Sequence, residues 1–342
     1  MKKKIINAII YLITLGVCAF LIWYSIKDLT TEQVEKIKFA LGKAHYILLI
    51  PIFIMGIISH WSRAMRWKIL MEPLDMKPKS LNVFFAVMIG YMTNLLLPRV
   101  GEVVKCTILA RYEKTPADKL VGTIITERAF DFLCLLLILV VAILVQYDLA
   151  MNYMNSFFNK VNDESSSSSY TSWYVLIGII LLIVGIYVSR NWLTKFSFIQ
   201  RIKKALVNIL SGIMSFKSMK NKKGFVFHTC LIWGMYMSMI VLGFHSIDET
   251  SHLSINTSLS VLSFGSFGMI ATPGGIGAYT FLVDEIVQLY GVEKAISVAI
   301  SWIIWLVPTL IILLFGIISL IILPIYNNKY AKQTGTDTAE NI

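Results

Sequence analysis

Charged side chains interrupt the apolar segments of this sequence at three places. The first is the stretch SHWSRAMRW at 59–67, where Arg63, Arg66 and Trp67 lie close together at the end of an apolar run. Guanidinium groups match the oxygens of a phosphate, and indole rings favour the membrane interface. These residues therefore predict contact with a lipid phosphate. The alternative is that they only anchor the helix end by extending to the interface.

The second place is LLLPRVGEVVK at 95–105, where a proline, a glycine and three charges follow an apolar run. Ionisable side chains at membrane depth are costly, which favours a site that faces a cavity. The free amides at the start of the helix after the break would attract an anionic headgroup. The spacing of Glu102 and Lys105 also permits simple mutual neutralisation. The candidate residues of this region are Asn94, Arg99, Gly101, Glu102 and Lys105.

The third place is TERAFD at 126–131, inside a predicted membrane helix. Glu127 lies about 12 Å along this helix at about 1.5 Å per residue, too deep for easy hydration without a cavity. Asp131 is one turn away, and Arg128 lies between the two carboxylates in sequence. With the three charges at 95–105 they make three positive and three negative groups. Because a neutral paired cluster is the cheapest way to keep charge in a membrane, a purely structural network is the alternative to a binding site.

The composition is that of an integral membrane protein. Of 342 residues, 56% are hydrophobic and 15% are charged, against about 25% charged in a typical soluble domain. The net charge of +11 is concentrated on one predicted membrane face, since residues 190–223 contain nine Lys/Arg and no acidic residue. This segment is predicted to be cytoplasmic, beside anionic lipid, and the acidic serine-rich segment 146–170 to be outside. The excess of positive charge therefore indicates no nucleic-acid partner.

Loop charges and run lengths predict an all-α polytopic membrane protein with about eight hydrophobic segments. Both ends of residues 81–112 are predicted to lie on the basic side, which indicates a re-entrant hairpin that is broken at 98–101. Residues 255–291 predict a second hairpin that enters from outside. Six full spans and two hairpins then form an inverted repeat, which indicates a transporter site near the midplane. Eight kinked spans are the alternative. The second break consists of Pro273, Gly274, Gly275 and Gly277.

The sequence predicts one membrane domain over residues 1–342. Its parts are an N-terminal anchor and amphipathic segment (1–45), a first repeat with its cytoplasmic hairpin (46–146), an outer loop, span and basic linker (147–223), a second repeat with its outer hairpin (224–323) and a cytoplasmic tail (324–342).

The sequence offers little for metal or nucleotide chemistry. The four cysteines are isolated, with no metal-ligand spacing, and are predicted to be buried free thiols. No metal site, cofactor site, nucleophile with its base, or nucleotide loop is indicated, so any transport is predicted to be passive or ion-coupled. Asp284 and Glu285 either bind a cation or mark the outer surface.

Four stretches occur in succession: SRAMRWKILMEPL, NLLLPRVGEVVKCTILAR, ERAFDFLCLL and TPGGIGAYTFLVDE. Together they resemble the membrane region of lysylphosphatidylglycerol synthases, a flippase-like family, over about residues 5–325. The resemblance implies movement of an aminoacylated phospholipid between leaflets, with the lipid made by a separate soluble domain. No such domain follows the last predicted span, so lysyl transfer and tRNA binding are not carried over.

The resemblance also implies site residues. Val100 departs from the small residue that the family often has after the arginine. The residues that match its motifs are Arg63, Arg66, Asn94, Arg99, Gly101, Glu102, Glu127, Arg128, Asp131, Pro273, Gly274, Gly275 and Gly277.

The sequence therefore predicts a flippase that moves a phospholipid, an aminoacyl-phospholipid or another lipid-linked headgroup across the bacterial inner membrane. Both termini are expected in the cytoplasm, with phospholipid of the anionic inner leaflet as partner and a separate lipid-modifying enzyme as a second one. No enzymatic activity is expected. The alternatives are an intramembrane enzyme that uses Glu102 or Asp131 as a base on a lipid headgroup or polyprenyl phosphate, and a partner subunit of lipid or glycan synthesis.

Overall fold

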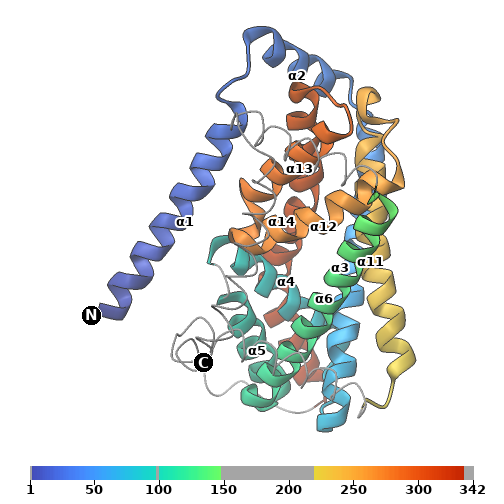
Figure 1. Ribbon diagram of the computed structural model, residues 1–342. Coiled ribbons are helices and arrows are strands. Elements are labelled where there is room, and N and C mark those ends of the chain that lie inside the picture. Colours follow the sequence, from blue (N-terminus) through green and yellow to red (C-terminus); the bar gives the residue numbers. More distant parts are fainter. Residues whose placement is uncertain (1, 98–99, 148–218, 335–342) are drawn as a thin grey trace, which may run out of the picture.

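The computed structural model describes residues 2–97, 100–147 and 219–334 (Figure 1), and all regular secondary structure in these ranges is helical. The all-α prediction is therefore confirmed. Most of the predicted acidic loop (148–170), the span at 173–189 and most of the basic linker (190–218) lie outside the described residues, as do Pro98 and Arg99.

Within the described ranges, four helices are long and apolar enough to cross a membrane. A fifth candidate is the pair formed by α1 (Lys2–Ile26) and α2 (Thr31–Lys43), which are bent by 99° at their junction. The chain is thus a polytopic membrane protein with four to five candidate spans in its described part, together with shorter apolar helices. The four long helices are α3 (Leu49–Met71), α6 (Ala117–Val145), α11 (Lys222–Phe244) and α14 (Lys294–Thr334).

The first broken pair consists of α4 (Ser80–Leu96) and α5 (Val100–Glu113). Two glycines allow these helices to touch through their backbones, since a Cβ on Gly101 would lie 1.9 Å from the carbonyl oxygen of Gly90. The side chain of Asn94 accepts a 2.8 Å hydrogen bond from the Gly101 N–H. It thereby satisfies one of the amides that a helix start leaves free. This hydrogen bond ties the start of α5 to the last turns of α4 across the break.

The second broken pair consists of α12 (Ile255–Ala271) and α13 (Ala278–Leu289), joined by a short 3-10 turn at Pro273–Gly275. Gly274 and Gly277 have φ values of 58° and 74°, which glycine adopts without the steric cost that other residues pay. A Cβ on Gly268 would lie 2.7 Å from the Cα of Tyr279, so small residues bring these helices together as well.

The tips of the two broken pairs meet near the middle of the molecule. In Figure 1, α4 and α5 lie in the lower half and α12 and α13 in the upper half. A Cβ on Gly274 would lie 2.3 Å from Cδ2 of Leu95, which places the last turn of α4 against the second break. Each tip is therefore packed on the other, and α14 runs behind both pairs.

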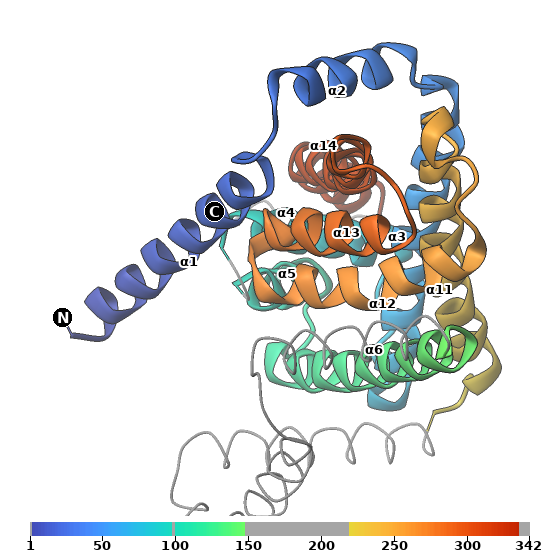
Figure 2. The ribbon, with the colours of Figure 1, turned by 45° about the horizontal axis from the view of Figure 1, so that its top comes forward.

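Helix α1 stands at the edge of the bundle (Figure 2) and contacts both broken pairs. The hydroxyl of Tyr11 donates to the carbonyl oxygen of Leu96 at 3.2 Å, beside the first tip. The carbonyl oxygen of Cys18 would lie 2.7 Å from a Cβ on Gly277, beside the second tip. A single helix therefore borders the two tips where they meet.

Candidate functional site

Two arginines of α3 and two carboxylates of α6 form the centre of a buried charge cluster. Arg63 and Arg66 are one turn apart on α3, and Glu127 and Asp131 are one turn apart on α6, so each pair lies on one helix face. Asp131 accepts from Arg63 Nη1 at 3.1 Å and from Arg66 Nη2 at 2.6 Å. Arg66 Nη2 also lies 3.4 Å from Glu127. The first and third predicted groups are thereby brought together.

The second predicted group joins this centre through Lys105 of α5. The Lys105 Nζ lies 3.0 Å from Glu127 and 3.3 Å from Glu102. It also lies 4.5 Å from the ring centroid of Trp67, a cation–π contact in a fully buried environment. The Trp67 Nε1 donates to Thr123 at 2.8 Å. Trp67 therefore forms an inner wall of the cluster, whereas its sequence position suggested a place at the membrane interface.

Arg128 lies at the open edge of the cluster. Its side chain is 43% exposed, and its distances to Glu127, Asp131 and Glu102 are 3.4, 3.7 and 3.9 Å. Glu102 beside it is 25% exposed, whereas Glu127 is 1% exposed. The cluster is thus accessible from the side on which Arg128 and Glu102 lie.

The described members of the cluster have a net charge of +1. Their charges were expected to cancel, and the excess arises because α3 contributes two arginines while Arg99 lies outside the described residues. A buried network that is not neutral is costly in a membrane. The surplus favours an anionic ligand over a closed structural network. The four cations are Arg63, Arg66, Lys105 and Arg128, and the three carboxylates are Glu102, Glu127 and Asp131.

Arg66 has guanidinium N–H groups that donate no hydrogen bond to the described residues. Its side chain is 0% exposed, and neither Nε nor Nη1 has a hydrogen-bond partner among the described residues. Its guanidinium carbon lies 5.7 Å from the centroid of Phe225, on α11. Leaving buried donors unpaired costs free energy, and such groups are uncommon outside functional sites.

Two residues of the cluster were not predicted, because they are uncharged. Arg63 Nε donates to the hydroxyl of Tyr236 at 2.9 Å, and Arg63 Nη1 lies 3.4 Å from the hydroxyl of Tyr91. Tyr236 lies on α11, in a largely apolar run, and its spacing from other polar residues does not indicate a site residue. Only the packing of α3 against α11 brings it to the arginine.

Asn94 and Gly101 lie beside the cluster and shape the hairpin tip. Because Asn94 occupies the Gly101 N–H, that amide is not free for the anionic headgroup that the sequence suggested. The close approach at Gly101 fixes α5 against α4. This contact sets the position of Glu102 and, one turn later, of Lys105. The role of Asn94 and Gly101 in this structure is therefore to position these charged side chains.

The second break lies apart from the charges. Gly274 packs against Leu95 of the first tip, and its carbonyl oxygen accepts from Trp305 Nε1 at 2.8 Å. A Cβ on Gly275 would lie 2.4 Å from the sulfur of Met269. Pro273 and Gly275 are buried and Gly277 borders α1, so these predicted site residues form the meeting point of the tips.

Asp284 is buried inside a second polar group at the opposite end of the molecule. Its carboxylate accepts from Ser25 of α1 at 2.9 Å and lies 2.8 Å from Lys294 Nζ. Gln288 and Ser297 also donate to it. Asp284 thus joins α1 to α13 and α14, whereas Glu285 is half exposed and fits the surface position suggested for both. No three His, Cys, Asp or Glu residues in the described ranges are placed to hold a metal ion.

The cysteines are all free in the described part of the chain, where Cys18 and Cys106 are buried and Cys230 is exposed. Cys134 on α6 is only partly buried, so the expectation of four buried thiols is met at two positions and is wrong at Cys230, which lies on α11, a helix long enough to cross a membrane.

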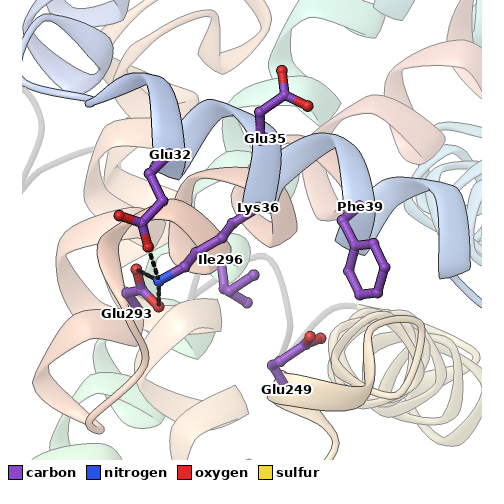
Figure 3. Close-up of a pocket in the computed structure, with 7 residues that line it drawn as sticks. All are labelled: Glu32, Glu35, Lys36, Phe39, Glu249, Glu293 and Ile296. Carbon is purple, nitrogen blue, oxygen red and sulfur yellow. Dashed lines mark hydrogen bonds and ion pairs between the residues drawn. The ribbon is translucent and has the colours of Figure 1, made fainter.

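A cavity of about 570 Å³ lies between α2 and the second half of the bundle, away from the charge cluster (Figure 3). Lys36 bridges Glu32 and Glu293 across it at 3.4 and 3.0 Å. These contacts are exposed ion pairs, which contribute little to stability. The remaining lining residues are Glu35, Phe39, Glu249 and Ile296.

The family comparison agrees with the motifs quoted above. The family described as Lysylphosphatidylglycerol synthase TM region matches residues 9–316, a range that includes every residue of the charge cluster and both breaks. No curated protein and no solved structure matches the chain. The resemblance inferred from the sequence is confirmed, and the chain belongs to the lysylphosphatidylglycerol synthase TM region family.

Proposed function

We propose that this membrane protein moves a phospholipid, or another lipid with a phosphate headgroup, between the two leaflets. The charge cluster is the single observation that supports the proposal most strongly. It includes Glu102 in the first turn of α5, has an accessible edge at Arg128 and contains buried guanidinium donors without partners among the described residues. Membership of a family related to lipid modification and transport agrees with it.

In this proposal the headgroup passes the charge cluster while the acyl chains stay in the bilayer. Guanidinium groups bind phosphate oxygens through charge-assisted hydrogen bonds, and the carboxylates keep the empty site close to neutral. The two tips, which touch at Leu95 and Gly274, are the elements whose separation would open a path between the leaflets. The protein acts in the bacterial inner membrane with both termini cytoplasmic.

Reconstitution tests the proposal directly. Purified protein in liposomes should accelerate exchange of fluorescent phospholipid between leaflets, measured by chemical quenching of the outer leaflet, relative to protein-free liposomes. Glu102→Gln should slow the exchange, since Glu102 pairs with Lys105 and Arg128 at the accessible edge. Arg111→Gln is the matched control, because Arg111 is exposed on the same helix outside the cluster. Folded wild-type protein that exchanges no lipid class would overturn the proposal.

The rival activity is chemical modification of a lipid headgroup with Glu102 or Asp131 as a base. Lipid mass spectrometry of a deletion strain separates the two. A lost lipid species supports the enzyme, whereas an unchanged inventory with an altered leaflet distribution supports transport. We propose transport because Asp131 is held by two arginines, at 3.1 and 2.6 Å, which hinders its use as a base.

A further inference from the structure

Arg128 has the weakest pairing of the four cations in the charge cluster. Arg63 and Arg66 each approach Asp131, and Lys105 approaches Glu127, at distances of 3.1, 2.6 and 3.0 Å. The contacts of Arg128 with carboxylates are all longer, from 3.4 to 3.9 Å. The three short contacts involve Asp131 twice and Glu127 once, and Glu102 lies 3.3 Å from Lys105 and 3.9 Å from Arg128. Arg128 is therefore the cation of the described cluster that the carboxylates neutralise least closely.

The depth of Arg128 makes the surplus positive charge of the cluster costly without a ligand. It lies about 16 Å along α6 from Ala117, at about 1.5 Å per residue, in a helix of 29 residues that is a candidate membrane span. Its side chain is 43% exposed, so it is not enclosed by protein. An exposed guanidinium at this depth needs water or an anion beside it.

We infer that Arg128 binds the phosphate of a lipid whose headgroup has one net negative charge, such as phosphatidylglycerol, and selects it over zwitterionic and cationic lipids. The inference rests on the proposed function and narrows its substrate class. One negative charge neutralises the +1 of the cluster. A zwitterionic headgroup leaves this charge in place, and an aminoacylated headgroup with one net positive charge raises the total to +2.

The buried donors of Arg66 support the same class of ligand. Its Nε and Nη1 have no partner among the described residues and lie in the same cluster as Arg128. A phosphate drawn in by Arg128 has oxygens that such donors can bind. Of the three carboxylates, only Glu102 has a buried oxygen, Oε2, without a hydrogen-bond partner among the described residues, so a cationic ammonium would find one acceptor there against the two unpaired donors of Arg66 and a net positive charge.

Lipid binding to the purified protein tests the inference without requiring transport. Native mass spectrometry in detergent would measure retention of phosphatidylglycerol, phosphatidylethanolamine and lysylphosphatidylglycerol. Wild-type protein should retain phosphatidylglycerol about tenfold more tightly than the other two, the factor expected from one hydrogen bond to a charged group. Arg128→Gln should abolish the preference, and Arg128→Lys should keep most of it because the charge stays. Arg111→Gln, on α5, is the control for loss of a charge elsewhere.

Equal retention of the three lipids by the wild type would overturn the inference, as would an unchanged preference in folded Arg128→Gln. Thermal unfolding verifies the fold of each variant. Displacement of phosphatidylglycerol by inorganic phosphate at millimolar concentration would overturn a lipid as the ligand, since a soluble anion would then bind as well. Preferred binding without any lipid exchange in liposomes would instead refute the proposed function and leave the selectivity intact.

Discussion

Replacing Glu127 with glutamine tests whether the charge cluster is stabilised by mutual pairing. Glu127 lies 3.0 Å from Lys105 and 3.4 Å from both Arg66 and Arg128. At an effective dielectric constant of about 20, one such pair at 3 Å has a Coulomb energy of about 5–6 kcal/mol. Part of this is offset by desolvation, and removing one partner of a buried pair costs about 3–5 kcal/mol. We expect E127Q to lower the free energy of unfolding by that amount.

A second substitution separates pairing from packing. K105M should cost less, about 1.5–3 kcal/mol, because Glu127 keeps two arginine partners and the methionine still packs on Trp67. The double variant E127Q/K105M no longer has a buried ammonium paired only with Glu102. It should therefore be more stable than E127Q alone, which requires a coupling energy larger than the cost of K105M by itself.

Thermal unfolding of purified protein in detergent, followed by tryptophan fluorescence at one scan rate, measures this order. Each kcal/mol should lower Tm by about 2–4 °C. E35Q is the control, since Glu35 forms an exposed pair with Lys38 that contributes little. A double variant that is less stable than E127Q, or E127Q as stable as E35Q, would refute the reasoning.

Three further predictions concern the hairpin tips and α1. G101A should lower the free energy of unfolding by about 1–3 kcal/mol, because the added Cβ meets the backbone of α4. G122A has open space around the added Cβ and should gain up to about 1 kcal/mol. The reverse order of Tm values would contradict the close contact. N94A should cost about 1 kcal/mol through loss of the hydrogen bond that the Gly101 N–H donates, and an unchanged Tm would exclude this role. T272C should form a disulfide with Cys18, because Cys18 borders the second tip, where its carbonyl oxygen would lie 2.7 Å from a Cβ on Gly277. Counting maleimide-reactive thiols detects it, and failure to form under oxidation would argue against the docking of α1 on the second tip.

The helical class, the two breaks and the three charged stretches could be predicted from sequence because each has a local cause. Apolar length predicts a span, and proline with glycine predicts a break. The partners inside the cluster could not be predicted in this way. Nothing in the spacing of Arg63 and Arg66 indicates that they bind Asp131, since that contact depends on how α3 packs against α6.

Residue type alone was misleading where one residue has two plausible roles. Tryptophan is a residue type that often anchors a helix at the membrane interface, yet Trp67 is fully buried with its ring beneath Lys105. Asparagine is a residue type that often contacts a ligand, yet the side chain of Asn94 accepts a hydrogen bond from the Gly101 N–H. Tyr236 had no distinguishing feature at all. For Trp67 and Tyr236 the deciding neighbour is distant in sequence, whereas for Asn94 it lies seven residues away, across the break.

The contact between the two tips has a consequence for the ion barrier of the membrane. A protein that moves charged headgroups must do so without letting protons leak across the membrane. Where the halves meet, an aliphatic side chain, Leu95, packs on Gly274, and neither has a polar group in its side chain. This contact offers a proton no side-chain donor or acceptor. While the tips touch, an apolar contact therefore lies between the charges around Glu127 and the carboxylate of Asp284.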